Sequence, residues 1–163
     1  MFKIRRLKSS DAKKFHQLRL AGLLTDPESF ASDLNSEKKK KIADVKSSLK
    51  ENFLIGAFDG ANLVGSTAVY GFRFVSMSHK GKIGFTYVLP EFRRFGLGRK
   101  LMEFALVQAR KMRFDQVQLD VVVGNNPAIR LYKSLGFVKW GTEKKAIKIG
   151  KKYLDEIHMA KFF

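Results

Sequence analysis

The residues best suited to chemistry form a basic, glycine-containing loop, Arg93-Arg94-Phe95-Gly96-Leu97-Gly98, which Arg99 follows directly. Gly96 and Gly98 lack the Cβ atoms that would hold a ligand away from the main chain. The helix expected after the loop leaves its first N–H groups without intrahelical partners, and the positive end of its dipole favours an anion. The arginines add permanent charge and can bond phosphate oxygens in pairs. The loop therefore predicts a phosphate site, with a diphosphate as its natural occupant.

Two apolar segments must position this loop. Ile83 to Val88 is typical of a strand, and a turn at Leu89 and Pro90 separates it from the loop. After the loop, apolar residues recur at helical spacing as far as Met112, so one side of this helix is expected to pack on a sheet. A buried scaffold is thus predicted to hold the loop.

The spacing excludes two common phosphate-binding loops. A dinucleotide fingerprint requires a third glycine where Leu101 stands, and a P-loop requires Gly-Lys-Ser/Thr, whereas Gly98 is followed by Arg99 and Lys100. The arrangement of strand, loop and amphipathic helix instead resembles the acetyl-CoA pyrophosphate loop of the GNAT superfamily, the acyl-CoA-dependent N-acyltransferases.

A second segment carries the same resemblance. Asn125 to Phe137 is similar to the other hallmark of that superfamily, an Asn-x-x-Ala-x-x-Leu-Tyr helix closed by Gly-Phe. The two motifs are independent and occur in the right order, and the resemblance covers roughly residues 82 to 140. The chain is therefore identified as a member of the GNAT superfamily, with no subfamily specified.

The resemblance implies an α/β (α+β) GNAT fold that forms one N-acetyltransferase domain over residues 1–163. Its central sheet would be mixed, mostly antiparallel and of six to seven strands, with about four flanking helices and strands 4 and 5 splayed. Strands are expected at Phe2–Leu7, Phe53–Phe58, Leu63–Phe74, Ile83–Val88, Gln116–Val123, Phe137–Trp140 and Tyr153–Met159. Helices are expected from Ala12 to near Leu24, from Ser36 past Leu49, from Arg99 to Met112, and from Asn125 to Leu135. The apolar run Gln116–Val123 predicts a strand covered on both faces.

The resemblance also implies how the acyl-donor co-substrate, acetyl-CoA, would bind. The backbone of Tyr87 to Leu89 would pair with the pantetheine arm, and the Val88 N–H would polarise the thioester carbonyl. Asn125 would face this arm, or would only cap its helix, and Ala128 would leave the arm room. The expected CoA-binding residues are Tyr87, Val88, Leu89, Arg93, Arg94, Phe95, Gly96, Leu97, Gly98, Arg99, Asn125, Ala128 and Tyr132.

Two residues are candidates for proton transfer. By the resemblance, Tyr132 lies near the CoA sulfur as a general acid or hydrogen-bond donor; the alternative is an aromatic residue with its hydroxyl at the surface. Asp120 could accept a proton through water or anchor a cationic acceptor, or it could simply bond the backbone or a lysine. Lys82 stands where some members carry a glutamate base. Deprotonation by water, with no dedicated base, also remains open.

The acceptor side is less defined by the sequence. The connection between the first two helices lines the acceptor cleft in the family, which makes Glu28 and Phe30 candidates for acceptor recognition. The alternative is that Glu28 caps a helix and Phe30 is a packed aromatic.

Composition limits the classes of function. The chain has no cysteine, which excludes disulfides, thiolate metal ligands and a cysteine nucleophile, and its three histidines are scattered, so no metal is expected. It lacks an apolar run of signal-peptide or membrane-span length, which predicts a cytoplasmic protein without a membrane partner. The net charge of +17 comes largely from dispersed lysines without interleaved aromatics, so no nucleic-acid partner is expected.

The leading hypothesis is an N-acetyltransferase that transfers an acetyl group from acetyl-CoA to a primary amine by direct attack in a ternary complex. A Gly-x-Ser-x-Gly nucleophile motif is absent. The acceptor would be a small-molecule amine or a peptide amine. The sequence leaves open whether the protein forms a homodimer. The alternative is a catalytically weak CoA-binding or nucleic-acid-docking module on the same fold.

Overall fold

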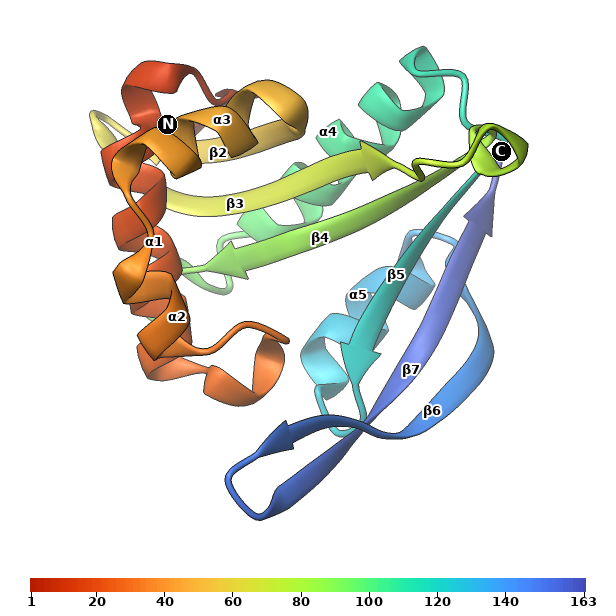
Figure 1. Ribbon diagram of the computed structural model, residues 1–163. Helices are drawn as coiled ribbons and strands as arrows, with labels where there is room; N and C mark the ends of the chain where they lie inside the picture. Colours follow the sequence, from red (N-terminus) through yellow and green to blue (C-terminus); the bar gives the residue numbers. More distant parts are fainter.

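The computed structural model describes residues 1–163 and contains a seven-stranded sheet in the order β1-β2-β3-β4-β5-β7-β6 (Figure 1). The strands are β1 (Lys3–Arg6), β2 (Phe53–Asp59), β3 (Asn62–Gly71), β4 (Lys80–Val88), β5 (Gln116–Val122), β6 (Val138–Ile149) and β7 (Lys152–Phe162). The α-helices are α1 (Ala12–Thr25), α2 (Leu34–Lys39), α3 (Ile42–Glu51), α4 (Leu97–Lys111) and α5 (Asn126–Ser134). Only β4 and β5 pair in parallel. The predicted mixed, mostly antiparallel GNAT architecture is confirmed.

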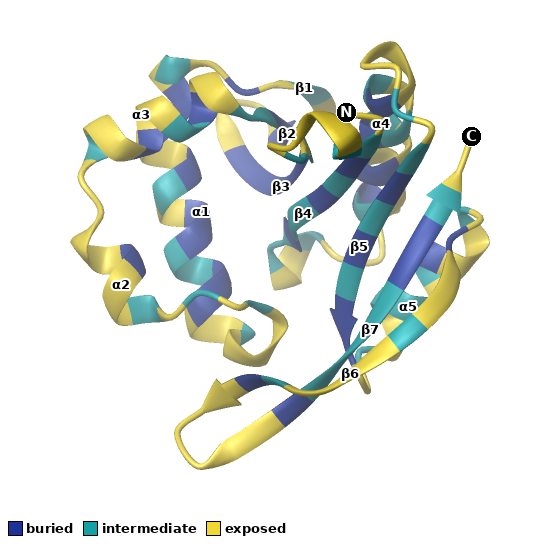
Figure 2. Ribbon diagram, turned by 45° about the vertical axis from the view of Figure 1, so that its right-hand side comes forward, coloured by how far each residue is buried: buried dark blue, intermediate teal, exposed yellow.

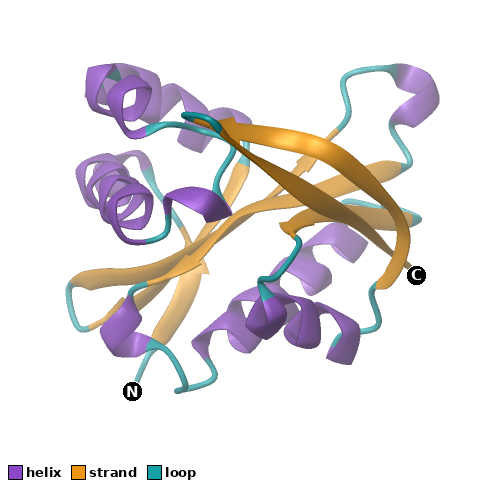
Figure 3. Ribbon diagram, turned by 90° about the horizontal axis from the view of Figure 1, so that it is seen from below, coloured by secondary structure: helices purple, strands orange, loops and turns teal.

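The helices form a layer on each face of the sheet (Figure 3). Helix α4 buries the apolar side predicted from its spacing, including Leu97, Leu101 and Met102, against one face. Helices α1 and α3 bury residues such as Phe15 and Leu49 against the opposite face of β2 to β4. No helix has both the length and the apolar character needed to cross a membrane.

The second predicted helix is two helices, so the prediction of one continuous helix from Ser36 past Leu49 is wrong. Lys40 and Lys41 have extended backbones, with ψ of 132° and 149°, and they separate α2 from α3. The Asp44 carboxylate accepts the Lys41 N–H at 3.1 Å, which gives α3 a beginning of its own. The break turns Glu37 inward, where it pairs with the buried Arg19 at 3.4 Å.

Three strand predictions also need correction. Strand β6 continues to Ile149 and does not end at Trp140. Strand β3 ends at Gly71 rather than Phe74, where it pairs with Gly81. A Cβ on Gly81 would lie 2.5 Å from the Phe114 ring. The ring therefore packs directly on the main chain of Gly81, where there is no room for a side chain. Strand β5 is covered on one face along most of its length, because Val117, Leu119 and Val121 are buried while Gln116, Gln118 and Asp120 are partly exposed. Only at its end is the second face covered, where Val122 is buried with Ile147 and Leu154. Figure 2 shows this alternation along β5, and it also shows the exposed residues of β6.

A β-bulge in β4 decides which side chains face which layer. Ser66 pairs with Tyr87 and Ala68 with Gly84, so Thr67 alone opposes both Phe85 and Thr86. Phe85 takes a left-handed backbone, with φ of 53°. The buried Ser66 and Thr67 hydroxyls bond the Phe85 carbonyl at 3.0 Å and the Thr86 hydroxyl at 2.9 Å. The bulge therefore directs Phe85 and Tyr87 to the α1 side and Thr86 to the α4 and α5 side.

Candidate active site

The centre of the candidate site is the divergence of β4 and β5. The two strands pair only at Lys80–Gln116, Gly81–Val117 and Lys82–Gln118, and no pairing joins the rest of their lengths. Figure 1 shows them separating toward their carboxyl ends, where α4 and α5 begin. Beyond Lys82, the edge of β4 that faces β5 keeps free main-chain groups that can pair with an extended ligand. This confirms the predicted splay.

One of these groups is the Val88 amide. The N–H of Leu89 donates to the Val64 carbonyl of β3 at 3.0 Å, and adjacent residues of a strand direct their amides to opposite edges. The Val88 N–H therefore points away from β3, into the gap between the diverging strands β4 and β5. The Val88 carbonyl lies on the same side and accepts a hydrogen bond from Arg93 Nε at 2.9 Å.

The amino end of α4 has the properties of an anion site. Its N-cap is Gly96, with φ of 73°, and no side chain caps its first N–H groups. A Cβ on Gly98 would meet nothing nearer than Leu131 Cδ2, at 3.4 Å, which is an ordinary contact. Since glycine inside a helix costs about 1 kcal/mol relative to alanine, and protein packing does not require it here, the open space over Gly98 fits a bound ligand.

The loop arginines are not equivalent. Arg93 is committed to the protein, because its guanidinium also pairs with Asp26 at 2.6 Å. Arg99 bonds Ser134 Oγ at 2.6 Å and Glu103 at 3.4 Å. Arg94 is exposed and has no ion pair, so it is the loop cation that is freest to move onto a ligand. Phe95 is 63% exposed, whereas Leu97 is a core residue that offers only its backbone.

Tyr132 is buried on the α5 side of β4 and β5 and does not lie at the surface. Its side chain is buried, with its ring 6.0 Å from that of Phe137, and burial raises the pKa of its hydroxyl to about 12 despite a hydrogen bond with Thr86. A phenol with this pKa stays protonated at physiological pH and can donate a hydrogen bond. The structure thus brings Tyr132 to the β4 bulge and does not support a surface hydroxyl.

Helix α5 begins beside the carboxyl end of β5. The Asn125 side chain accepts the Ala128 N–H at 3.4 Å, so the predicted helix cap is present. Ala128 is half-buried against the core that contains Tyr132. Both residues therefore lie at the open end of the splay.

A match to a protein-family model accords with this geometry. The model, described as the acetyltransferase (GNAT) family, matches residues 20–137. The chain belongs to this acetyltransferase (GNAT) family. The matched residues include β4, the phosphate-site loop, α4, β5 and α5, which are the elements that form the site.

Named relatives match shorter segments. A mycothiol acetyltransferase of Thermobispora bispora is 48% identical over 63 residues, which cover 37% of this chain and 21% of that protein. An N-alpha-acetyltransferase of Sulfurisphaera tokodaii is 39% identical over 59 residues, which cover 36% of this chain and 35% of that protein. The chain thus spans about a fifth to a third of the length of these relatives.

Solved structures of GNAT proteins match the whole fold. A GNAT-family acetyltransferase of Streptococcus pneumoniae superposes with a TM-score of 0.90 at 23% identity, covering 100% of both chains. A putative acetyltransferase of Salmonella typhimurium, solved with its cofactor acetyl-CoA, superposes with a TM-score of 0.88 at 17% identity, covering 99% of this chain and 94% of that one.

Asp120 is the centre of a polar network on the β5 face without helices. Its carboxylate bonds Lys82 Nζ at 2.5 Å and His158 Nδ1 at 2.7 Å. Burial opposes ionisation, but the bonds to Lys82 and His158 outweigh it and hold the pKa of Asp120 below its usual range. Both oxygens are occupied and the carboxylate is a weak base, so this geometry disfavours Asp120 as the proton acceptor.

The charges of this network permit a prediction on stability. Lys82→Met is expected to lower the free energy of unfolding by about 1 kcal/mol at pH 7. The pKa of Asp120 is lowered and that of Lys82 is raised, so the contribution of the pair is lost as pH falls through the former or rises through the latter. Urea denaturation should therefore give a difference from wild type that shrinks between pH 7 and pH 2. Lys80→Met, two residues earlier, is the matched control; a loss that does not depend on pH would contradict the electrostatic account.

Glu28 and Phe30, the candidates for acceptor recognition, both contact protein groups. Glu28 pairs with Lys152 Nζ at 2.6 Å, which links the segment after α1 to the β6–β7 hairpin. The Phe30 ring lies 5.8 Å from that of Tyr87, and its edge would be 3.1 Å from a Cβ on Gly22. The Phe30 ring thus packs on protein groups, and Lys152 pairs with the Glu28 carboxylate. The role of both residues in acceptor recognition stays a prediction.

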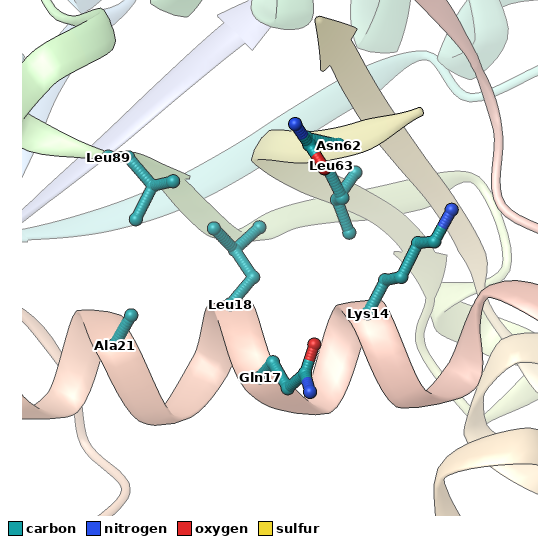
Figure 4. A pocket seen from close by; sticks show the side chains of 7 residues that line it. All are labelled: Lys14, Gln17, Leu18, Ala21, Asn62, Leu63 and Leu89. Atoms are coloured by element: carbon teal, nitrogen blue, oxygen red, sulfur yellow. The ribbon is translucent and has the colours of Figure 1, made fainter. Parts of the chain in front are cut away.

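A hollow of about 320 Å³ lies outside the splay (Figure 4). It is formed by Lys14, Gln17, Leu18 and Ala21 of α1, together with Asn62, Leu63 and Leu89. Figure 4 shows Leu18 and Leu89 pointing into it from facing elements. Because it lies on the β3 side of β4, we assign it no part in the chemistry.

Sequence reasoning missed three residues of this region. Thr86 contacts Tyr132 only because of the bulge in β4. His158 and Glu156 belong to β7, which pairs with β5 although it follows β5 by about 40 residues in the sequence. A signal was available for the last two, since polar residues alternate with apolar ones in β7. No group of three or more acidic or histidine side chains is arranged to hold a metal ion.

Proposed function

We propose that this protein is an N-acetyltransferase that transfers the acetyl group of acetyl-CoA to a primary amine by direct attack in a ternary complex. The observation that carries the proposal is the uncapped amino end of α4, with open space over Gly98, at the mouth of the β4–β5 splay. Membership of the acetyltransferase (GNAT) family supports it, as does the related fold solved with acetyl-CoA.

The proposed donor site runs from α4 into the splay. The diphosphate would lie on the N–H groups at the start of α4, with Arg94 and Arg99 as charge partners. The pantetheine arm would extend along the free edge of β4 and pair with the backbone from Tyr87 to Leu89. Asn125 and Ala128 would border this arm from α5.

The protein contributes two hydrogen-bond donors to the proposed reaction. The Val88 N–H would donate to the thioester oxygen as negative charge develops there. The Tyr132 hydroxyl, which is protonated at neutral pH, would donate a hydrogen bond to the departing CoA sulfur and give up its proton as negative charge develops there. The amine attacks the carbonyl carbon directly, so no covalent enzyme intermediate is required.

The acceptor is proposed to be a small-molecule amine or a peptide amine. Relatives named as a mycothiol acetyltransferase and an N-alpha-acetyltransferase support this range. The net charge of +17 opposes the approach of polycationic acceptors, except where acidic side chains lower the local potential.

An acceptor screen tests the proposal. Release of free thiol from acetyl-CoA would be followed with spermine, aminoglycosides, free amino acids and short peptides. We expect one class to stimulate thiol release well above acetyl-CoA hydrolysis. If there is no stimulation by any amine, and duplex DNA or RNA binds at physiological salt, the protein is instead a docking module.

A further inference from the structure

On the open face of β4 to β7, opposite α5, Glu156 lies with the four charged groups that act on its pKa: Lys82, Asp120, Glu143 and His158. Register places Asp120 opposite His158, and Val122 opposite Glu156, at the last pair of β5. Helix α5 covers the other face of these strands and supplies Tyr132 to the gap. An acceptor that meets a donor held along β4 must therefore approach from the open face.

Most bases on this face are already committed to partners. Lys82 and His158 take both oxygens of Asp120, as described above. The second nitrogen of His158 lies 3.3 Å from Glu143, and the Trp140 indole stacks on the ring at 5.1 Å. Glu143 is itself 56% exposed at its side chain. None of these side chains is both partly buried and free to accept a proton.

Glu156 differs from its neighbours. It is half-buried and makes neither an ion pair nor a side-chain hydrogen bond. Burial, and then the Asp120 carboxylate, raise its pKa above the usual range; Glu143 acts in the same direction, while Lys82 and His158 oppose the shift. A carboxylate with a raised pKa is better matched to accepting a proton near neutral pH.

We infer that Glu156 is the general base of the reaction and removes the proton from the ammonium form of the acceptor, directly or through one water. This inference rests on the proposed acetyl transfer. It identifies the acceptor as an amine that enters as a cation, since an unpaired carboxylate beside Asp120 favours a cation over a neutral molecule.

The proton balance of the step is complete. Glu156 takes one proton from the acceptor ammonium and later passes it to solvent. The C–N bond then forms and the C–S bond breaks, with its electron pair remaining on sulfur, which takes the Tyr132 proton. The proton lost by the new amide nitrogen returns to Tyr132 through water. The products are the amide, CoA thiol and one solvent proton.

The test compares Glu156→Gln with Glu143→Gln, which alters the residue opposite it in β6. The acceptor is the most active amine of the thiol-release screen. We expect Glu156→Gln to lower kcat at least tenfold at pH 7 and Glu143→Gln to lower it less than threefold. The dissociation constant of acetyl-CoA, measured by calorimetry, should change less than twofold in both variants.

The pH profile and chemical rescue separate a base from a structural role. Wild-type kcat should fall as pH drops through the raised pKa of Glu156, and this limb should keep its position when a second acceptor of different amine pKa is used. The limb should be absent in Glu156→Gln. In Glu156→Ala, added formate should restore part of the rate.

Two outcomes overturn different parts of the account. If wild type acetylates an amine while Glu156→Gln keeps its kcat and acid limb, the inference about Glu156 is wrong and the proposed function stands. If wild type neither binds acetyl-CoA nor acetylates any amine, the proposed function fails, and the inference fails with it.

Discussion

Replacing Gly98 with glutamate is expected to weaken acetyl-CoA binding at least a hundredfold, or roughly 3 kcal/mol, as measured by calorimetry. The new side chain would extend into the open space at the start of α4, where the diphosphate is proposed to lie. A carboxylate there removes room and repels phosphate, and it competes for the uncapped N–H groups. Acetyl transfer should be lost for the same reason.

This result requires that the fold be intact. A Cβ at Gly98 makes only an ordinary contact with Leu131, so the variant should keep a melting temperature near that of wild type. Val107→Glu makes the same change in charge at an exposed position of α4 and should bind acetyl-CoA normally. Tight binding by folded Gly98→Glu would exclude this loop as the diphosphate site.

Tyr132→Phe is expected to lower kcat about a hundredfold while leaving the dissociation constant of acetyl-CoA within threefold of wild type. The substitution removes only the hydroxyl, which is buried next to Thr86 and protonated at neutral pH. The ring would keep its contact with Phe137. A loss confined to kcat would indicate that the hydroxyl acts as sulfur departs rather than in binding.

Tyr153→Phe provides the matched control, because this tyrosine is 49% exposed on β7 and lies outside the site. It should retain wild-type kcat. Normal turnover by Tyr132→Phe would remove the hydroxyl from the mechanism and leave proton donation to water. A donor thioester with a more acidic leaving thiol should also narrow the gap between the variant and wild type, since such a thiolate needs less assistance.

Much of the scaffold of the candidate donor site could be predicted from the sequence, because it depends on residues that are close together in the chain. The glycines of the loop, the strand before it and the helix after it lie within 30 consecutive residues, from Ile83 to Met112. The apolar spacing that fixes the buried side of α4 is also local, as is the Asn125 cap of α5. Such features follow from backbone geometry and helical periodicity, which act over a few residues.

The tertiary structure alone decided which proton-transfer groups are available. Pairing with β3 produces the bulge that directs Thr86 toward Tyr132, because one residue of β3 opposes two of β4. Lys82 of β4 and His158, which the pairing of β7 with β5 brings next to it, bond the two oxygens of the Asp120 carboxylate. Glu156 on the same face has no such partner. A carboxylate can be held in an ion pair or can be free to accept a proton, depending on its burial and on charges from strands that are distant in the sequence. These properties cannot be read from the sequence near the carboxylate. The sequence by itself indicated the fold family and the candidate anion loop, and three-dimensional pairing determined which titratable groups near the gap between β4 and β5 are paired and which are free.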